Sequence, residues 1–224
     1  MAFVITIDGP GGSGKGTVSK IVADYFKFHI LDSGAIYRVL AYAAWKKRID
    51  LDNEQELITL ADNLNLTFKP SGDSVLTVLD EEDISSAVRT EETGAMASRI
   101  ASLPGVRTAL LKRQRDFAQE PGLVGDGRDL GTVVFPDAHL KIFLDASAEI
   151  RAKRRFDQLR SKGKDADYEK ILEDIRQRDL RDRTRAVAPL KPADDAICID
   201  TSEINALEVS IQIIELARKR GAHQ

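Results

Sequence analysis

The stretch Gly9-Pro10-Gly11-Gly12-Ser13-Gly14-Lys15-Gly16-Thr17 decides the fold of this chain. It directly follows the apolar run Phe3–Ile7 and precedes apolar residues at helical spacing, which gives the order strand, glycine-rich loop, helix. In that order, backbone N–H groups and the positive end of the helix dipole converge on one anion. Lys15 adds a point charge for phosphate oxygens. The stretch therefore predicts a P-loop that binds a polyphosphate.

A glycine-rich surface turn is the alternative interpretation of the same stretch. The β-branched strand before it and the amphipathic helix pattern after it favour the P-loop, because both are part of that motif. One position departs from the usual pattern. Gly16 stands where a serine or threonine normally follows the lysine, and the hydroxyl comes one residue later, on Thr17.

Composition excludes several classes of partner. The 224 residues include 33 Lys and Arg against 36 Asp and Glu, a net charge of −3. Proteins that bind nucleic acid or anionic membranes are normally basic, so we expect neither partner. The sequence shows no signal peptide and no apolar run of about 18 residues, which predicts a cytoplasmic protein. We expect a monomer. The single cysteine, Cys198, lies in an apolar run and is interpreted as a small core residue rather than a reactive thiol.

Five short runs rich in Val, Ile and Leu predict buried parallel strands, and helical patterns separate them. The runs are Phe3–Ile7, His29–Leu31, Leu123–Gly125, Leu140–Leu144 and Ala196–Ile199. The alternation predicts an α/β three-layer fold of the P-loop NTP hydrolase type with a five-stranded parallel sheet. Helices are predicted over Tyr168–Arg183 and Asn205–Arg220. Each strand ends in a polar or acidic cluster, and these clusters should face one crevice.

Two segments interrupt the α/β alternation. Between residues 62 and 86, alternating apolar residues, a Pro-Ser-Gly-Asp turn and a second apolar run predict a small antiparallel sheet. Residues 160–167 form a polar break between two charged helices, which is either a short lid or an ordinary loop. We predict a single domain over residues 1–224, with a core of 1–35, 120–150 and 185–224, an insert of about 36–119 and a lid of about 151–170.

Arginines are concentrated near the C-terminal end of one predicted helix. Arg178, Arg181, Asp182 and Arg185 fall on one helical face at i, i+3, i+4 and i+7. A solvated face with salt bridges is the alternative, but the P-loop favours phosphate binding, for which the planar guanidinium is suited. One member of a second group is also expected to reach the phosphates: Arg151, Arg154 or Arg155.

Two further strand ends carry candidate binding residues. Ser33 and Arg38 begin the helix after the second strand, where a helix cap and a phosphate pocket are compatible roles. After the third strand, Asp126 is suited to hold the water shell of a metal ion, and Arg128 and Asp129 to reach an acceptor. The histidines show no metal-binding spacing, and His139 is interpreted as structural.

With these motifs the chain resembles the bacterial cytidylate kinases, members of the nucleoside monophosphate kinase family. The motifs that carry the resemblance lie in order along nearly the whole chain: residues 7–17, 31–38, 125–136 and 178–190. The Gly-Lys-Gly-Thr ending is the variant of the P-loop found in this family, which accounts for Gly16. The resemblance implies ATP-dependent phosphorylation of CMP and dCMP, with Mg²⁺.

The resemblance also implies roles for individual residues. ATP is bound by Gly9, Pro10, Gly11, Gly12, Ser13, Gly14, Lys15, Gly16 and Thr17. CMP is bound by Ser33, Arg38, Ser98, Arg107, Arg128, Asp129, Arg178, Asp182 and Arg185. The catalytic residues are Lys15, Arg128, Arg181 and Arg185. Within the CMP set, Ser98 and Arg107 match positions that read cytosine, whose amine, N3 and O2 need both donors and acceptors. No direct metal ligand is assigned, and Thr17 and Asp126 are candidates through water.

Two other functions remain as alternatives. One is a P-loop kinase for UMP or another small molecule, such as a shikimate-type enzyme, since one buried hydrogen bond to the base decides among nucleotides. The other is a nucleotide switch without catalysis. A guanine-specific switch usually carries an Asn-Lys-x-Asp run, and no Asn in this sequence is followed by Lys.

Overall fold

The fold was analysed in a computed structural model that describes residues 2–71 and 74–223. Its main sheet has five parallel strands in the order β2-β6-β1-β7-β8. The strands are β1 (Phe3–Asp8), β2 (His29–Asp32), β6 (Gly122–Gly127), β7 (Leu140–Asp145) and β8 (Ile197–Asp200). The prediction of a five-stranded parallel sheet in an α/β fold is therefore confirmed.

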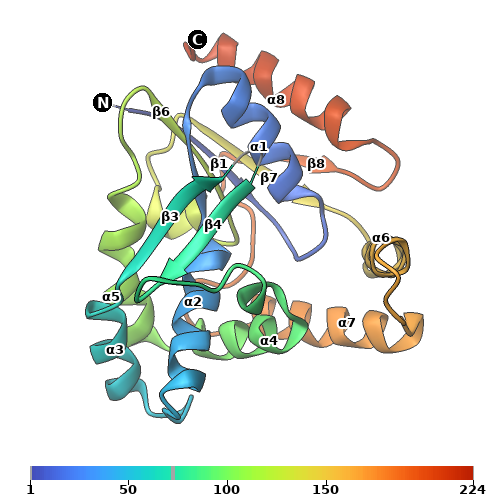
Figure 1. The fold of residues 1–224 in the computed structure, drawn as a ribbon. Helices are drawn as coiled ribbons and strands as arrows, with labels where there is room; N and C mark the ends of the chain where they lie inside the picture. Colours follow the sequence, from blue (N-terminus) through green and yellow to red (C-terminus); the bar gives the residue numbers. More distant parts are fainter. Residues whose placement is uncertain (1, 72–73, 224) are drawn as a thin grey trace. The chain divides into compact units, whose positions relative to one another are not determined.

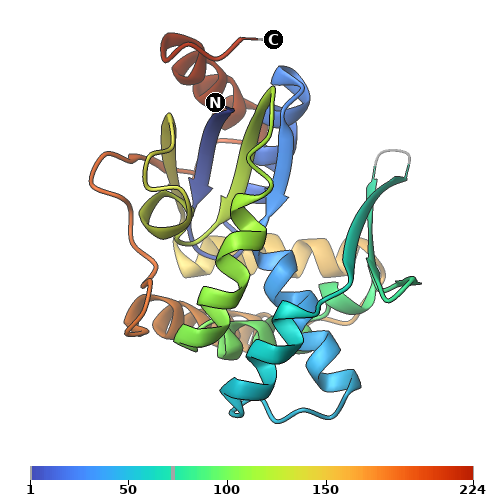
Figure 2. The same ribbon diagram turned by 90° about the vertical axis from the view of Figure 1, so that its left-hand side faces the viewer.

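One face of this sheet is covered by α1 (Lys15–Phe26) and α8 (Ala206–Lys219), which run side by side (Figures 1 and 2). Val22 and Ile213 are fully buried among the strand residues of this face. Asn205 starts α8 with a reciprocal capping box to Glu208, which satisfies orphan N–H groups of the first turn. This apolar layer holds the sheet and α1 in place, and with them the start of the glycine-rich loop.

The opposite face of β1 is polar at its C-terminal end. Strand residues alternate between faces, so Thr6 and Asp8 point away from α1 and α8. Both are buried against η2 (Leu130–Val134), a single π-helical turn that follows β6. The carboxylate of Asp8 accepts hydrogen bonds from the backbone of this turn.

The edge strands differ from the prediction of five buried strands. In β2 and β8 only Leu31 and Ile199 are buried, because each strand lies at an edge of the sheet. The interpretation of Cys198 as a core residue is wrong, since its side chain is exposed on β8. Local hydrophobicity identifies a strand, but strand order decides how much of it is covered.

The chain divides into two compact units, Met1–Asp32 with Gln114–Gln224, and Ser33–Arg113. The first unit also contains α6 (Ala148–Ser161) and α7 (Tyr168–Thr184), which pack against each other. The predicted division into core, insert and lid stays a prediction. No helix in the described part of the chain is long and apolar enough to cross a membrane.

The second unit combines helices with a small sheet. Its three-stranded antiparallel sheet, order β3-β4-β5, confirms the predicted hairpin (Figure 2). Residues 72 and 73 of the predicted turn lie outside the described residues. The elements are α2 (Ser33–Lys46), α3 (Glu54–Asp62), β3 (Leu66–Ser71), β4 (Ser74–Leu79), β5 (Glu82–Asp83), η1 (Ala87–Arg89), α4 (Glu91–Ile100) and α5 (Pro104–Arg115).

Candidate active site

The glycine-rich loop runs from the end of β1 to the first turn of α1. Gly9 has φ +147°, and a Cβ there would lie 2.0 Å from the carbonyl oxygen of Leu144, so only glycine fits between the loop and β7. Lys15 folds back over the loop, and its Nζ donates to the carbonyl of Pro10 at 2.8 Å. Among the described residues no side chain caps α1, which leaves its first N–H groups for an anion.

A buried lysine and a partly buried carboxylate interact electrostatically beside this loop. Burial lowers the pKa of Lys15 to about 8, and the negative charge of Asp126 opposes that effect. Burial also raises the pKa of the Asp126 carboxyl to about 7, which the charge of Lys15 opposes and that of Asp32 reinforces. Phosphate oxygens near Lys15 would favour its charged form. The loop is therefore electrostatically prepared for an anion.

The structure explains the glycine at position 16. A Cβ on Gly16 would lie 3.3 Å from Oδ2 of Asp126, so a serine or threonine there would crowd the carboxylate. Thr17 is exposed in the first turn of α1. These two oxygen-bearing side chains fit Mg²⁺, which typically takes one or two carboxylates and completes its shell with phosphates and water. The described residues contain no cluster of three or more acidic, Cys or His side chains that would form a closed metal site.

Arginine–carboxylate pairs lie directly against the loop. Arg128 forms an ion pair with Asp182, which is buried, and Arg178 lies 3.9 Å from the same carboxylate. A Cβ on Gly11 would lie 3.3 Å from Nη2 of Arg128 and 3.7 Å from Nη1 of Arg178. Burial raises the pKa of Asp182, but the charges of Arg128 and Arg178 outweigh it and the net shift is downward. Asp182 therefore stays ionised beside these two guanidinium groups.

A second pair completes this group of charges. Nη2 of Arg185 lies 3.5 Å from Oδ1 of the buried Asp129, and Nε of Arg185 donates to the carbonyl of Ala188 at 2.6 Å. Arg181, predicted to share a helical face with Arg178 and Arg185, is exposed. The catalytic role predicted for Arg181 stays a prediction.

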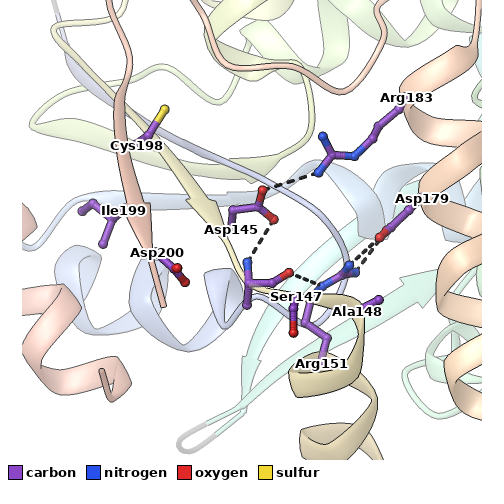
Figure 3. Close-up of a pocket in the computed structure, with 10 residues that line it drawn as sticks. Asp145, Ser147, Ala148, Arg151, Asp179, Arg183, Cys198, Ile199 and Asp200 are labelled. Carbon is purple, nitrogen blue, oxygen red and sulfur yellow. Dashed lines mark hydrogen bonds and ion pairs between the residues drawn. The ribbon is translucent and has the colours of Figure 1, made fainter. Parts of the chain in front are cut away.

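A pocket of about 590 Å³ opens beside the loop, at the carboxyl ends of β7 and β8. Figure 3 shows the guanidinium of Arg151, from α6, turned toward Asp179 on α7, and Arg183 reaching Asp145. The strand-end acids at this crevice follow from the sequence, but Asp179 carries no sequence signal that separates it from an ordinary helix-surface residue. The lining is Asp145, Ala146, Ser147, Ala148, Arg151, Asp179, Arg183, Cys198, Ile199 and Asp200.

Arg151, which lines this pocket, and Thr201, which follows β8, both contact the loop. Nη1 of Arg151 donates to the carbonyl of Gly11 at 3.1 Å, and Oγ1 of Thr201 donates to the carbonyl of Ser13 at 3.2 Å. Of the three arginines expected near the phosphates, Arg151 therefore contacts the loop itself. Arg154 instead binds Thr201, and Arg155 binds Gln158 at 2.5 Å.

The other predicted binding residues belong to Ser33–Arg113. Ser33, at the start of α2, and Ser98, on α4, are both buried. Arg38 donates to the carbonyl of Val88 at 2.9 Å. Arg107 is buried on α5, donates to the carbonyl of Ala101 at 3.1 Å and stacks over the ring of Tyr37 at 5.7 Å. Within this unit the fold thus buries polar groups of three helices, a costly arrangement unless hydrogen bonds satisfy them.

Comparison with known proteins identifies the family. Residues 5–219 match the family model described as cytidylate kinase. The chain belongs to the cytidylate kinase family. It is 54% identical over 220 residues to a cytidylate kinase of Aeromonas hydrophila, covering 98% of this chain and 96% of that one. It is 52% identical over 219 residues to a cytidylate kinase of Klebsiella pneumoniae, covering 98% and 96%.

Among solved structures, an uncharacterized protein from Eubacterium ventriosum aligns with a TM-score of 0.52 at 13% identity, covering 98% of this chain and 99% of that chain. This likeness supports the fold alone. Family membership makes the chain a kinase, a phosphotransferase. Phosphoryl transfer needs positioned positive charge rather than a covalent catalyst, and the cationic side chains Lys15, Arg128 and Arg178 lie at the glycine-rich loop.

Proposed function

We propose that this kinase transfers the γ-phosphoryl group of ATP to CMP or dCMP, giving ADP and CDP or dCDP. The observation that carries the proposal is the placement of Arg128 and Arg178 against Gly11, beside the buried Lys15. Such a group of fixed cations matches two phosphate chains that approach each other. The similarity to proteins named cytidylate kinase supports CMP as the acceptor.

ATP is the proposed donor, with its phosphates on the P-loop residues Gly9–Thr17. Its nucleoside end would extend into the pocket beyond Arg151, which contacts the loop through Gly11. Asp126 and Thr17 would hold Mg²⁺ through water. When bound, Mg²⁺ neutralises charge on the β- and γ-phosphate oxygens.

CMP or dCMP is the proposed acceptor, with a separate role for each group of residues. Arg128, Asp129 and Arg185 would bind and orient its phosphate, and Arg178 and Asp182 its sugar. The cytosine edge would be read by two further residues, whose burial supports recognition by hydrogen bonds: Ser98 and Arg107. Ser33 and Arg38 complete the proposed set.

In the transfer step, an oxygen of the CMP phosphate forms a bond to the γ-phosphorus while the bond to the β,γ-bridging oxygen breaks. The chain's own contribution is positioning and charge. Lys15 holds the donor phosphates, and Arg128 and Arg185 stabilise the negative charge on the transferred group. The ion pairs to Asp182 and Asp129 fix these two guanidinium groups before substrate arrives.

A coupled assay of ADP release tests the proposal, with CMP, dCMP, UMP and AMP offered at equal concentrations. We expect CMP and dCMP to give the highest kcat/KM, and Lys15→Met to abolish release with every acceptor. Faster turnover of AMP than of CMP would refute the acceptor assignment. Binding of GTP with no acceptor-dependent turnover would indicate a nucleotide switch instead. Addition of EDTA should stop turnover, and continued activity would exclude Mg²⁺.

A further inference from the structure

Asp8 is a buried acid immediately before the glycine-rich loop. It ends β1, and only 4% of its surface is exposed. Its Oδ1 accepts the backbone N–H of Leu130 at 2.9 Å, and its Oδ2 accepts that of Gly131 at 2.7 Å. One carboxylate therefore satisfies both N–H groups at the start of η2.

The segment that Asp8 holds carries two side chains of the proposed site. Arg128 and Asp129 come directly before η2, and they pair with Asp182 and Arg185 from the end of α7. The parallel pairing of β1 with β6 ends where Asp8 faces Gly127, so ladder hydrogen bonds do not hold the residues beyond. Beyond Gly127, the hydrogen bonds from the backbone of Leu130 and Gly131 to the Asp8 carboxylate connect β1 to η2.

The environment of Asp8 makes it a costly group to keep at this position. Burial raises its pKa to about 6, opposed by the two backbone hydrogen bonds. The charged groups that act on it are Asp129, which raises the pKa further, and Lys15, which lowers it. A neutral or apolar residue would avoid the cost of burying a charge beside these groups.

We infer that Asp8 is a positioning residue for phosphoryl transfer, which sets the turn bearing Arg128 and Asp129 through the backbone of Leu130 and Gly131. It contacts neither substrate in this role. The donor phosphates bind the loop and the acceptor phosphate binds Arg128, so Asp8 links the two halves of the site through the main chain. The inference rests on the proposed function for the identity of the reaction, but not on CMP as the acceptor.

Asp8→Asn in the full chain tests the inference. Asparagine keeps the shape but presents an NH₂ group where one N–H must be accepted, which displaces the turn. We expect kcat/KM for the acceptor to fall about 10- to 100-fold, as for other residues that orient a functional group. The Kd for ATP without acceptor, measured by calorimetry, should stay within about threefold of wild type, since the loop is intact. Hydrogen exchange in residues 128–134 should become faster.

Thr6→Val is the matched control. Thr6 is buried on the same face of β1 and approaches Gly131, but its Oγ1 makes no hydrogen bond among the described residues. Its kinetics and exchange should match wild type. Should Asp8→Asn melt below the assay temperature, Asp8→Ser, which is smaller and retains one acceptor, should give the same separation of acceptor kinetics from ATP affinity.

The assay uses whichever nucleoside monophosphate the wild type phosphorylates fastest, so a preference for UMP would refute the proposed acceptor and still test Asp8. A kcat/KM for Asp8→Asn within about threefold of wild type would overturn the inference. So would a loss of ATP affinity in proportion to the loss of acceptor kcat/KM, because a general structural defect affects both substrates.

Discussion

Replacing Lys15 with methionine should make the protein more stable while it abolishes catalysis. Burial lowers the pKa of Lys15 from its ordinary value of 10.5 to about 8. Each pKa unit corresponds to about 1.4 kcal/mol, so keeping this lysine charged in the folded state at pH 7 costs about 3 kcal/mol. Methionine fills similar space without that cost.

Two losses reduce the net gain. The variant lacks the hydrogen bond from Lys15 to the Pro10 carbonyl, although Ser13 still donates to that oxygen at 3.0 Å. Asp126 also loses the opposite charge that favours its ionisation. Allowing about 1 kcal/mol or somewhat more for these losses, we expect a net stabilisation of about 1–2 kcal/mol. For a chain of this size that raises Tm by roughly 2–8 °C.

The pH dependence of the Tm difference tests whether the buried charge of Lys15 causes the stabilisation. A lysine whose pKa is lowered by folding destabilises the protein at low pH, and this effect disappears as pH rises from about 8 to 10.5. The Tm difference between Lys15→Met and wild type, measured by circular dichroism, should therefore be largest at pH 7 and smaller at pH 10. Lys141→Met is the control, since Lys141 is also buried but pairs with Asp195 away from the loop.

Two results would refute this reasoning. One is a Lys15→Met variant that melts below wild type at pH 7, which would mean that the lysine contributes more through its contacts than its burial costs. The other is a Tm difference that stays constant between pH 7 and pH 10, which would remove the titration of Lys15 as its origin. Retained kinase activity would separately disprove the role of Lys15 in catalysis.

Four further substitutions separate catalysis, specificity and stability. Arg185→Ala should lower kcat about 10²- to 10³-fold with unchanged circular dichroism, because it removes one charge from the transferred phosphate, and wild-type turnover would reject that role. Arg107→Ala should reduce the ratio of kcat/KM for CMP over AMP about 10- to 100-fold, and an unchanged ratio would reject its role in reading the base. Asp182→Asn removes the carboxylate facing Arg128 and should cost roughly 3 kcal/mol at pH 7 by urea unfolding. Because folding lowers the pKa of Asp182, this cost should shrink as pH falls below about 4, and a constant cost would contradict the ion pair as its source. Asn205→Ala should cost about 1 kcal/mol by the same assay through loss of the capping box, and a change in kcat would show that α8 affects the site.

Sequence patterns that depend on near neighbours predicted their structures correctly. The glycine-rich loop forms between β1 and α1, and the helix predicted over Asn205–Arg220 forms as α8, with Asn205 as its N-cap. The structural interpretation of His139 is also confirmed, since its ring stacks on Phe3 and its Nδ1 accepts the N–H of Val4 at 3.1 Å. The loop and the cap depend on a few adjacent positions, whereas His139 is held by residues 135 positions away, and only its lack of metal-binding spacing was visible in the sequence.

Features set by packing between distant segments were not predictable in the same way. Cys198 is exposed because β8 lies at the edge of the sheet, and strand order is not encoded near residue 198. Ser98 and Arg107 look locally like helix-surface residues, yet both are buried. Arg181 shows the reverse case, because helical spacing groups it with Arg178 although it stays exposed. The family resemblance, rather than a local sequence pattern, made Ser98 and Arg107 candidate residues for reading the base.

The glycine at position 16 and the acid at position 8 both face the end of β6 and the turn that follows it. At one side of the loop, Oδ2 of Asp126 would lie 3.3 Å from a Cβ on Gly16, so a side chain there would crowd this carboxylate. At the other side, Asp8 reaches across to Leu130 and Gly131. The P-loop and the turn after β6 therefore pack as one element, in which the residue before the loop and a glycine within it are both set by the adjoining segment. The departure from the usual phosphate-binding motif at Gly16 thus follows from the position of the neighbouring Asp126 carboxylate.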